Sequence, residues 1–154
     1  MVTRTRFDAD PCPVARSIDA IGDWWSLLIV RDAFDGSRRF GEFQRSLGIA
    51  KNILTSRLRT LEEAGVMSTA PASDGSRHQE YVLTEKGRAL FPVIVALRQW
   101  GEAHCFDPGQ PHSRLLDRRN GRPLSPLEIR SSDGRLVGPD ETVVEKLSAT
   151  HGAG

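Results

Sequence analysis

Several features that mark other classes of protein are scarce in this sequence. Its 154 residues include only two cysteines, Cys12 and Cys105, too few for a disulfide framework or, by themselves, for a structural zinc site. The net charge is +1, so the overall charge gives no sign of a nucleic-acid partner. The longest nearly apolar run, residues 90–97, is interrupted by Pro92 and is much shorter than the roughly 18 residues of a membrane span.

Signals for secretion and catalysis are also absent from the sequence. Residues 1–10 are polar and lack the apolar stretch of a signal peptide, so we expect a cytoplasmic protein with no membrane partner. The sequence has no GxSxG motif and no glycine-rich phosphate loop. His104, Cys105 and His112 lack the further ligands of a tetrahedral zinc site. We therefore expect no enzyme, no bound metal and no cofactor. The four histidines are scattered along the chain: His78, His104, His112 and His151.

A locally basic segment stands out between residues 38 and 60. A local basic patch can bind phosphates even when the whole chain is nearly neutral. Ordinary solvated surface charge would explain the same composition, so the basic residues alone do not predict phosphate binding. Against one acidic residue, Glu42, it contains Arg38, Arg39, Arg45, Lys51, Arg57 and Arg59.

Apolar periodicity predicts four helices in the first 65 residues. They are expected near residues 13–21, 24–34, 41–47 and 50–64. Asp23 is a suitable N-cap for the second helix, and Gly65 is a suitable stop for the fourth. In the fourth helix the spacing of Leu54, Leu58 and Leu61 places these three side chains on one face, which we expect to meet the core.

A β-hairpin and a long helix follow. Residues 66–70 and 79–84 resemble two strands, and the segment between them is rich in turn-forming residues. Thr84 is a suitable cap for a helix over residues 85–104, which Pro92 should kink. This order of elements predicts an α+β fold: a winged helix-turn-helix domain over residues 11–104 with a long C-terminal dimerisation helix.

The composition changes after Cys105. Residues 107–140 contain five prolines, and Asn120-Gly121 and Asp133-Gly134 favour tight hairpin turns. We expect residues 105–154 to form a small β-rich extension with a mobile end. The role of this extension stays open.

The exposed face of the fourth helix has the chemistry to read DNA. With its leucines toward the core, Asn52, Ser56 and Arg59 project from the opposite side with Thr55 beside them. Arginine can grip guanine and asparagine can grip adenine through paired hydrogen bonds in the major groove. Lys51 stands at the helix N-terminus, where the helix dipole favours phosphate. From periodicity alone, an ordinary solvated helix is an equal alternative.

An ordered set of short motifs resembles the HxlR-type regulators, a branch of the winged helix-turn-helix regulators related to the MarR type. The match covers residues 11–104. The resemblance implies a homodimer on palindromic operator DNA, with the first and last helices at the dimer interface and the fourth helix in the major groove. This sequence departs from the family at Gly41 and Ala50, where stronger helix caps are usual. The motifs are Cys12-Pro13-Val14, Ile21-Gly22-Asp23-Trp24-Trp25, Arg39-Phe40, Leu54-x-x-Arg57-Leu58-x-x-Leu61, Glu63-Ala64-Gly65 and Tyr81-x-Leu83-Thr84-x-x-Gly87.

The remaining candidate residues follow from this resemblance. Arg77, near the hairpin tip, and Arg39 are expected to hold phosphates together with Lys51, although Arg77 could equally just solvate a loop. Regulators of this family often respond to oxidants through a cysteine just before the first helix, the place of Cys12. An inert cysteine packed in a dimer interface is the alternative. Surplus apolar side chains on the last helix favour dimerisation: Leu90, Val93, Ile94, Leu97 and Trp100.

The sequence therefore predicts a DNA-binding transcriptional regulator that acts as a homodimer on double-stranded operator DNA, most simply as a repressor. The alternative is a winged-helix module that binds only protein. A small-molecule inducer is compatible with either direction of regulation, and the sequence does not identify one.

Overall fold

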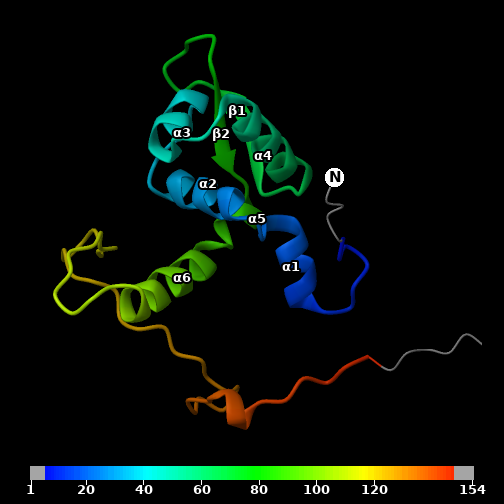
Figure 1. Ribbon diagram of the computed structural model, residues 1–154, viewed down its shortest axis with the longest axis vertical. Helices are drawn as coiled ribbons and strands as arrows, with labels where there is room; N and C mark the ends of the chain where they lie inside the picture. Colours follow the sequence, from blue (N-terminus) through cyan, green and yellow to red (C-terminus); the bar gives the residue numbers. More distant parts are fainter. Residues whose placement is uncertain (1–5, 148–154) are drawn as a thin grey trace, which may run out of the picture. The chain divides into compact units, whose positions relative to one another are not determined.

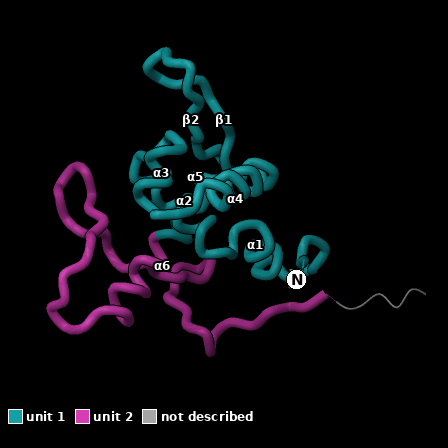
Figure 2. The backbone as a smooth tube through the Cα atoms, turned by 45° about the horizontal axis from the view of Figure 1, so that its top comes forward, with its two compact units in different colours: residues 1–94 teal, residues 95–154 magenta. Residues whose placement is uncertain are grey.

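The computed structural model describes residues 6–147; the last part of the predicted mobile end, residues 148–154, lies outside this range. The chain divides into two compact units, residues 1–94 (unit 1) and residues 95–154 (unit 2), as Figure 2 shows. This boundary falls ten residues before the one expected from composition. The functional division into a DNA-binding and dimerisation domain and an extension stays a prediction.

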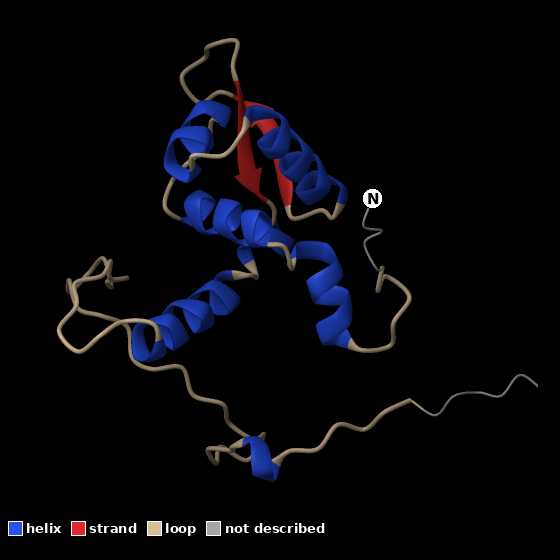
Figure 3. Ribbon diagram, in the orientation of Figure 1, coloured by secondary structure: helices blue, strands red, loops and turns tan. Residues whose placement is uncertain are grey.

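Unit 1 has the element order of a winged helix (Figures 1 and 3). Every predicted helix and strand up to residue 84 is present with its ends within one residue of the expected positions, because the apolar spacing and the turn residues agree there. The elements are α1 (Pro13–Ile21), α2 (Trp24–Phe34), α3 (Phe40–Leu47), α4 (Lys51–Glu63), β1 (Met67–Pro71) and β2 (Gln79–Leu83), followed by α5 (Glu85–Arg88). The α+β winged helix-turn-helix class is thus confirmed.

The sheet of unit 1 is a two-stranded antiparallel hairpin. Its register pairs Met67 with Leu83 at the base and Pro71 with Gln79 near the tip. The Tyr81 N–H donates to the Arg38 carbonyl at 2.7 Å, so the segment before α3 lies along the free edge of β2. This contact fixes where α3 begins relative to the hairpin.

The core of unit 1 lies where α2, α3 and α4 meet. Ile29 of α2, Phe43 of α3 and Leu54 of α4 are fully buried. The predicted leucine stripe of α4 is confirmed, since Leu58 and Leu61 are buried as well. Burying one face of α4 in this way leaves its opposite face in solvent.

Local signals at the helix ends are largely as expected. The Asp23 carboxylate accepts the Ser26 N–H at 2.9 Å and so caps α2. Gly48 ends α3 with φ +61°, a left-handed conformation that favours glycine. The Gly87 N–H donates to the Thr84 hydroxyl at 3.1 Å, as predicted for the cap of the next helix. Ala50 gives α4 no side-chain cap, which agrees with the weak cap expected there.

The helix predicted over residues 85–104 is broken into α5 and α6 (Phe91–His104). The break occurs at Ala89 and Leu90, and Pro92 is the second residue of α6. Proline has no N–H to donate to the carbonyl four residues earlier, and its ring crowds that carbonyl. The expected kink is therefore a complete interruption of the helix. In unit 1, the Phe91 ring packs against Phe34 of α2 with centroids 5.5 Å apart.

Unit 2 contains the rest of α6 and a mostly irregular extension. Both predicted turns form: Gly121 and Gly134 have φ +69° and +92°. The β structure around them is limited, among the described residues, to two isolated antiparallel bridges, Leu116 with Pro123 and Arg130 with Leu136. A short 3₁₀ helix, η1 (Pro139–Glu141), follows.

Two further observations concern residues 6–147 as a whole. None of the helices there has the length and hydrophobicity needed to cross a membrane. No three His, Cys, Asp or Glu side chains gather in that range in a way that would hold a metal ion.

Candidate nucleic-acid interface

The solvent face of α4 is mostly polar and is accessible. The helical repeat places the leucines of α4 on the inner face and the predicted DNA-contacting residues on the outer face. In the described part of the chain, no hydrogen bond or ion pair engages the side chains of Asn52, Ser56 or Arg59. Their donors and acceptors are thus available to a partner such as a base edge. All five predicted residues of α4 are exposed: Lys51, Asn52, Thr55, Ser56 and Arg59.

Thr55 is partly committed to its own helix. Its hydroxyl donates to the Lys51 carbonyl at 2.8 Å. The hydroxyl oxygen keeps its capacity to accept a hydrogen bond. We therefore expect Thr55 to contribute acceptor or methyl contacts to a partner rather than a donated hydrogen bond.

Arg57 does not share this face, although it belongs to the basic segment of the sequence. Its side chain is 31% exposed, and its Nε lies 3.5 Å from a carboxylate oxygen of Asp23. Asp23 is also the N-cap of α2. Arg57 therefore fastens α4 to the start of α2 and is withdrawn from the surface that could meet DNA. The helical spacing already hinted at this, since Arg57 lies three residues after Leu54 and four before Leu61, which places it beside the buried stripe.

The tip of the hairpin is exposed and carries one arginine. Arg77 and His78 are both exposed in the loop between β1 and β2, which projects from unit 1 (Figure 1). Within residues 6–147 no ion pair engages Arg77. Arg77 is thus free to reach a phosphate, as predicted for a wing.

A buried carboxylate anchors the base of this loop. Glu80 is 4% exposed and accepts three hydrogen bonds, from the Ser73 N–H at 3.1 Å, the Ser73 hydroxyl at 2.9 Å and Arg38 at 3.1 Å. The Ser73 hydrogen bonds, followed by Arg38, lower the pKa of Glu80 below its usual value. This role of Glu80 could not be predicted from the sequence, because an acidic residue in a short strand carries no signal that it is buried.

Arg39 connects α3 to the wing. Its guanidinium forms an ion pair with Asp74 in the loop, and this hydrogen bond raises the pKa of Arg39. The pKa of Asp74 lies well below its usual range, because the Ser76 N–H and hydroxyl and then Arg39 stabilise the carboxylate. A phosphate that binds Arg39 would have to compete with Asp74.

A groove of about 970 Å³ lies between α3 and the wing. Its basic side chains are Arg39, Arg45 and Arg77, against the acidic Glu42, Asp74 and Glu80. The structure thus brings Arg39 and Arg77, two predicted phosphate contacts, to one surface. The other five residues predicted to contact DNA all lie on α4.

Cys12 is the N-cap of α1 and is exposed. Its N–H donates to an Asp10 carboxylate oxygen at 2.8 Å. One turn further along α1, Arg16 donates from Nε to the Asp10 carbonyl. Cys105 follows α6 directly and is also exposed.

Comparison with known proteins assigns the class. A helix-turn-helix with an exposed, polar face on its fourth helix, followed by a β-hairpin, is typical of the winged helix-turn-helix transcriptional regulators. The model of the HxlR-like helix-turn-helix family matches residues 20–108. The chain belongs to this family.

Relatives of this chain carry corresponding names. An uncharacterized HTH-type transcriptional regulator of Mycobacterium tuberculosis is 42% identical over 132 residues, which span 86% of this chain and 82% of the relative. YdeP of Bacillus subtilis, another uncharacterized HTH-type transcriptional regulator, is 38% identical over 98 residues, 63% of this chain and 77% of YdeP.

Solved structures agree with the fold. PA1607, a candidate transcription factor, has 56% identity and a TM-score of 0.87, with 92% of this chain and 99% of that chain covered. The redox regulator HypR in its reduced form has 35% identity and a TM-score of 0.56, with 61% and 94% covered. The likeness to PA1607 extends through the extension, whereas the likeness to HypR covers only about the length of the winged-helix domain.

Proposed function

We propose that this regulator is a sequence-specific, homodimeric repressor that binds palindromic operator DNA in the cytoplasm and catalyses no reaction. The observation that carries the proposal is the exposed face of α4, where Asn52, Ser56 and Arg59 have no partner among the described residues. A helix about 10–12 Å wide fits the major groove, and such side chains match base edges there.

The candidate contacts divide into two groups. Asn52, Thr55, Ser56 and Arg59 would read bases, because they lie on the exposed side of α4. The phosphate contacts would come from Lys51 at the start of α4 and from Arg39 and Arg77 beside the groove. Phosphate contacts contribute affinity without sequence preference, whereas base contacts contribute specificity.

A winged-helix module that binds only protein is the second candidate. Such a module would need no cationic side chains on the exposed face of α4. Lys51 and Arg59 are both exposed there and form no ion pair within residues 6–147. This unneutralised charge favours a polyanionic partner.

Dimerisation is supported by apolar side chains that are left in solvent. On α1, Val14 and Ile18 are 66% and 53% exposed, and on α6, Leu97 and Trp100 are 50% and 62% exposed. Exposed apolar clusters of this kind mark interfaces. Light scattering should give twice the 17.0 kDa chain mass; a monomer at micromolar concentration would contradict the proposal. A symmetric dimer would favour inverted half-sites about ten base pairs apart, roughly 34 Å along the duplex.

The decisive experiment separates base contacts from phosphate contacts. Operator and scrambled duplexes compete for wild type, Arg59→Ala and Arg77→Ala across a salt series. Arg59→Ala should weaken operator binding by about 1–3 kcal/mol and scrambled binding much less. Arg77→Ala should weaken both equally and reduce the salt slope by about one unit.

Arg118→Ala is the matched control, because Arg118 is exposed in the extension rather than on α4 or the wing. It should leave both affinities unchanged. If Arg59→Ala weakened binding to both duplexes equally, Arg59 would be a phosphate contact and not a base contact. If Arg59→Ala weakened binding to neither duplex, α4 would not enter the major groove of DNA.

We further propose that Cys12 makes operator binding sensitive to oxidants. The thiol is exposed at the N-terminus of α1, where an oxidant in solution can reach it. HypR, a named redox regulator, and YodB of Bacillus subtilis are 35% and 31% identical neighbours. Hydrogen peroxide should lower operator affinity in wild type and in Cys105→Ser but not in Cys12→Ser. A full response in Cys12→Ser would remove Cys12 from the mechanism.

A further inference from the structure

A cavity of about 180 Å³ lies within unit 2, between α6 and the first part of the extension. None of the contacts proposed for DNA, dimerisation or redox sensing uses it. The volume equals the share of roughly six water molecules at about 30 Å³ each. It therefore suits a compound of about one ring and is smaller than a typical drug-sized site.

The inner wall of the cavity is apolar. Val95 of α6 contributes to it and is only 4% exposed. Leu115 and Leu124 line the cavity from the extension. A compact apolar body placed against these three side chains would be removed from water, which favours binding.

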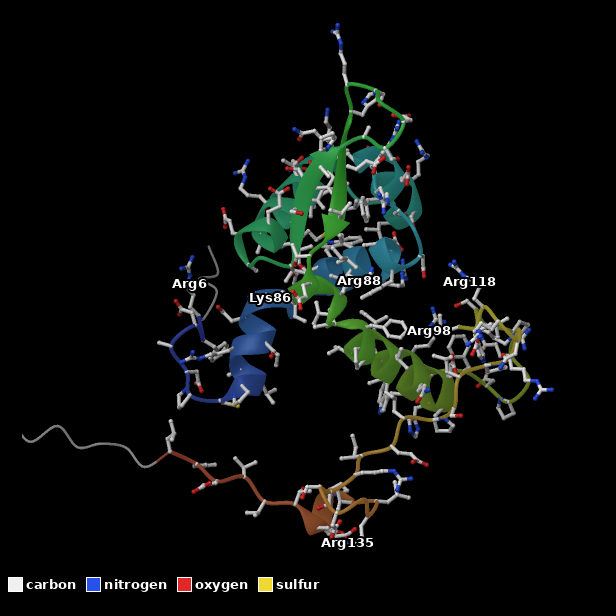
Figure 4. All side chains as sticks on the ribbon, turned by 180° about the vertical axis from the view of Figure 1, so that it is seen from behind. Arg6, Lys86, Arg88, Arg98, Arg118 and Arg135 are labelled. Atoms are coloured by element: carbon white, nitrogen blue, oxygen red, sulfur yellow. The ribbon has the colours of Figure 1, made fainter. Side chains whose placement is uncertain are left out.

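The polar part of the lining carries more positive than negative charge. Arg98 and Arg114 contribute two guanidinium groups, against the single carboxylate of Glu102. The Arg98 side chain projects from α6 (Figure 4). It donates from Nη1 to the Ser113 carbonyl at 3.2 Å and to the Ser113 hydroxyl at 3.0 Å. This leaves its Nε and Nη2 donors for a ligand. No hydrogen bond or ion pair in the described part of the chain engages the Arg114 side chain.

The walls are held together without a ligand. Gln99 of α6 donates from Nε2 to the Ser125 carbonyl at 3.0 Å and accepts the Leu127 N–H at 2.7 Å. Together with the Arg98–Ser113 contacts, these bonds pin two parts of the extension to α6. A preformed site binds more tightly because less ordering is needed on binding.

We propose that this cavity binds a small monocarboxylic acid with a compact apolar body, and that its occupancy alters operator binding. The second statement rests on the proposed function. The carboxylate would pair with Arg114 and the free donors of Arg98, since a planar guanidinium matches a carboxylate. The apolar body would lie on Val95 and Leu124. Glu102 would repel a second carboxylate, so dicarboxylic acids should bind poorly.

The test of binding uses the full chain without DNA. Benzoate is titrated by calorimetry, with benzyl alcohol, acetate and phthalate as probes that lack the charge, lack the ring or add a second charge. Benzoate should bind one per chain, at least tenfold more tightly than each of the others. Arg114→Gln and the cavity-filling Leu124→Trp should each weaken benzoate at least tenfold.

Arg118→Gln is the matched control, because it removes a guanidinium from the same extension but not from the cavity. It should bind benzoate like wild type. Circular dichroism checks that Arg114→Gln and Leu124→Trp are folded; if either is not, Glu102→Gln gives a separate readout and should improve phthalate binding severalfold.

The site is overturned if benzoate and benzyl alcohol bind equally, if benzoate does not bind, or if Arg118→Gln weakens it as much as Arg114→Gln. Operator binding is then measured with and without benzoate. Binding without any change in operator affinity overturns the effector role alone. A protein that binds benzoate but no DNA would overturn the proposed function and leave the site standing.

Discussion

Units 1 and 2 are stabilised in different ways. Eleven of the twelve buried apolar residues of the described chain belong to unit 1, and Val95 is the single one in unit 2. Unit 1 therefore derives its stability from a packed core, whereas unit 2 depends on glycine turns and on hydrogen bonds from α6. The packed core of unit 1 would suit the proposed presentation of α4 to DNA, and the small number of buried side chains in unit 2 leaves room for the proposed ligand.

The largest effect should come from a cavity in the core of unit 1. Phe43 is fully buried, so Phe43→Ala should reduce the free energy of unfolding by about 3–5 kcal/mol. Leu136 in unit 2 is 56% exposed, and Leu136→Ala should change it by less than about 0.5 kcal/mol. Urea denaturation measures both, and similar losses in the two variants would remove the contrast between the units.

The next effect concerns the cap of α2. Asp23→Ala removes the hydrogen bond to the Ser26 N–H and leaves Arg57 without its carboxylate partner. Loss of an N-cap costs about 1–2 kcal/mol. Asp35→Ala is the control, since Asp35 is exposed at the other end of α2 and caps through its backbone. If thermal unfolding shows the same stability loss for both, the Asp23 cap is not important.

A smaller, local effect is expected in unit 2. Gly121 has φ +69°, so Gly121→Ala should destabilise its turn by about 1 kcal/mol. Gly138→Ala is the control, because Gly138 has φ −105° and its nearest added contact would be 3.9 Å away. Hydrogen exchange should accelerate around residues 117–122 only in the first variant. Faster exchange in the core of unit 1 would show that the units are not independent.

The smallest effect concerns protonation of Glu80, which holds the base of the loop between β1 and β2. The pKa of Glu80 is lower in the folded protein than its usual value of 4.5, so its contribution to stability is fully present above pH 4.5. That contribution is lost as the pH falls through the lower pKa of the folded state. The Ser73 amide should therefore exchange faster at acidic pH, after correction for intrinsic exchange. In Glu80→Gln this extra acceleration should disappear; if it persists, another group is responsible.

Much of unit 1 could be predicted because local signals agree there. The spacing of Leu54, Leu58 and Leu61 gave both the buried and the exposed face of α4, and Gly65 gave its end. The ion pair of Arg57 with Asp23 could not be predicted, because composition counts a charge without saying whether it has a partner. The kink expected near Pro92 takes the form of a two-residue turn, Ala89 and Leu90, between α5 and α6.

The sequence by itself determined the winged-helix order of elements and the polar face of α4, since both depend on periodicity and turn chemistry within short segments. Only the tertiary structure decided that Arg57 serves Asp23, that Glu80 anchors Ser73 and Arg38, and that Arg98 and Arg114 line one cavity. The physical reason is that these contacts join residues separated along the chain by intervening turns and helices. Local spacing does not encode which distant charges meet, because packing of the whole unit brings them together.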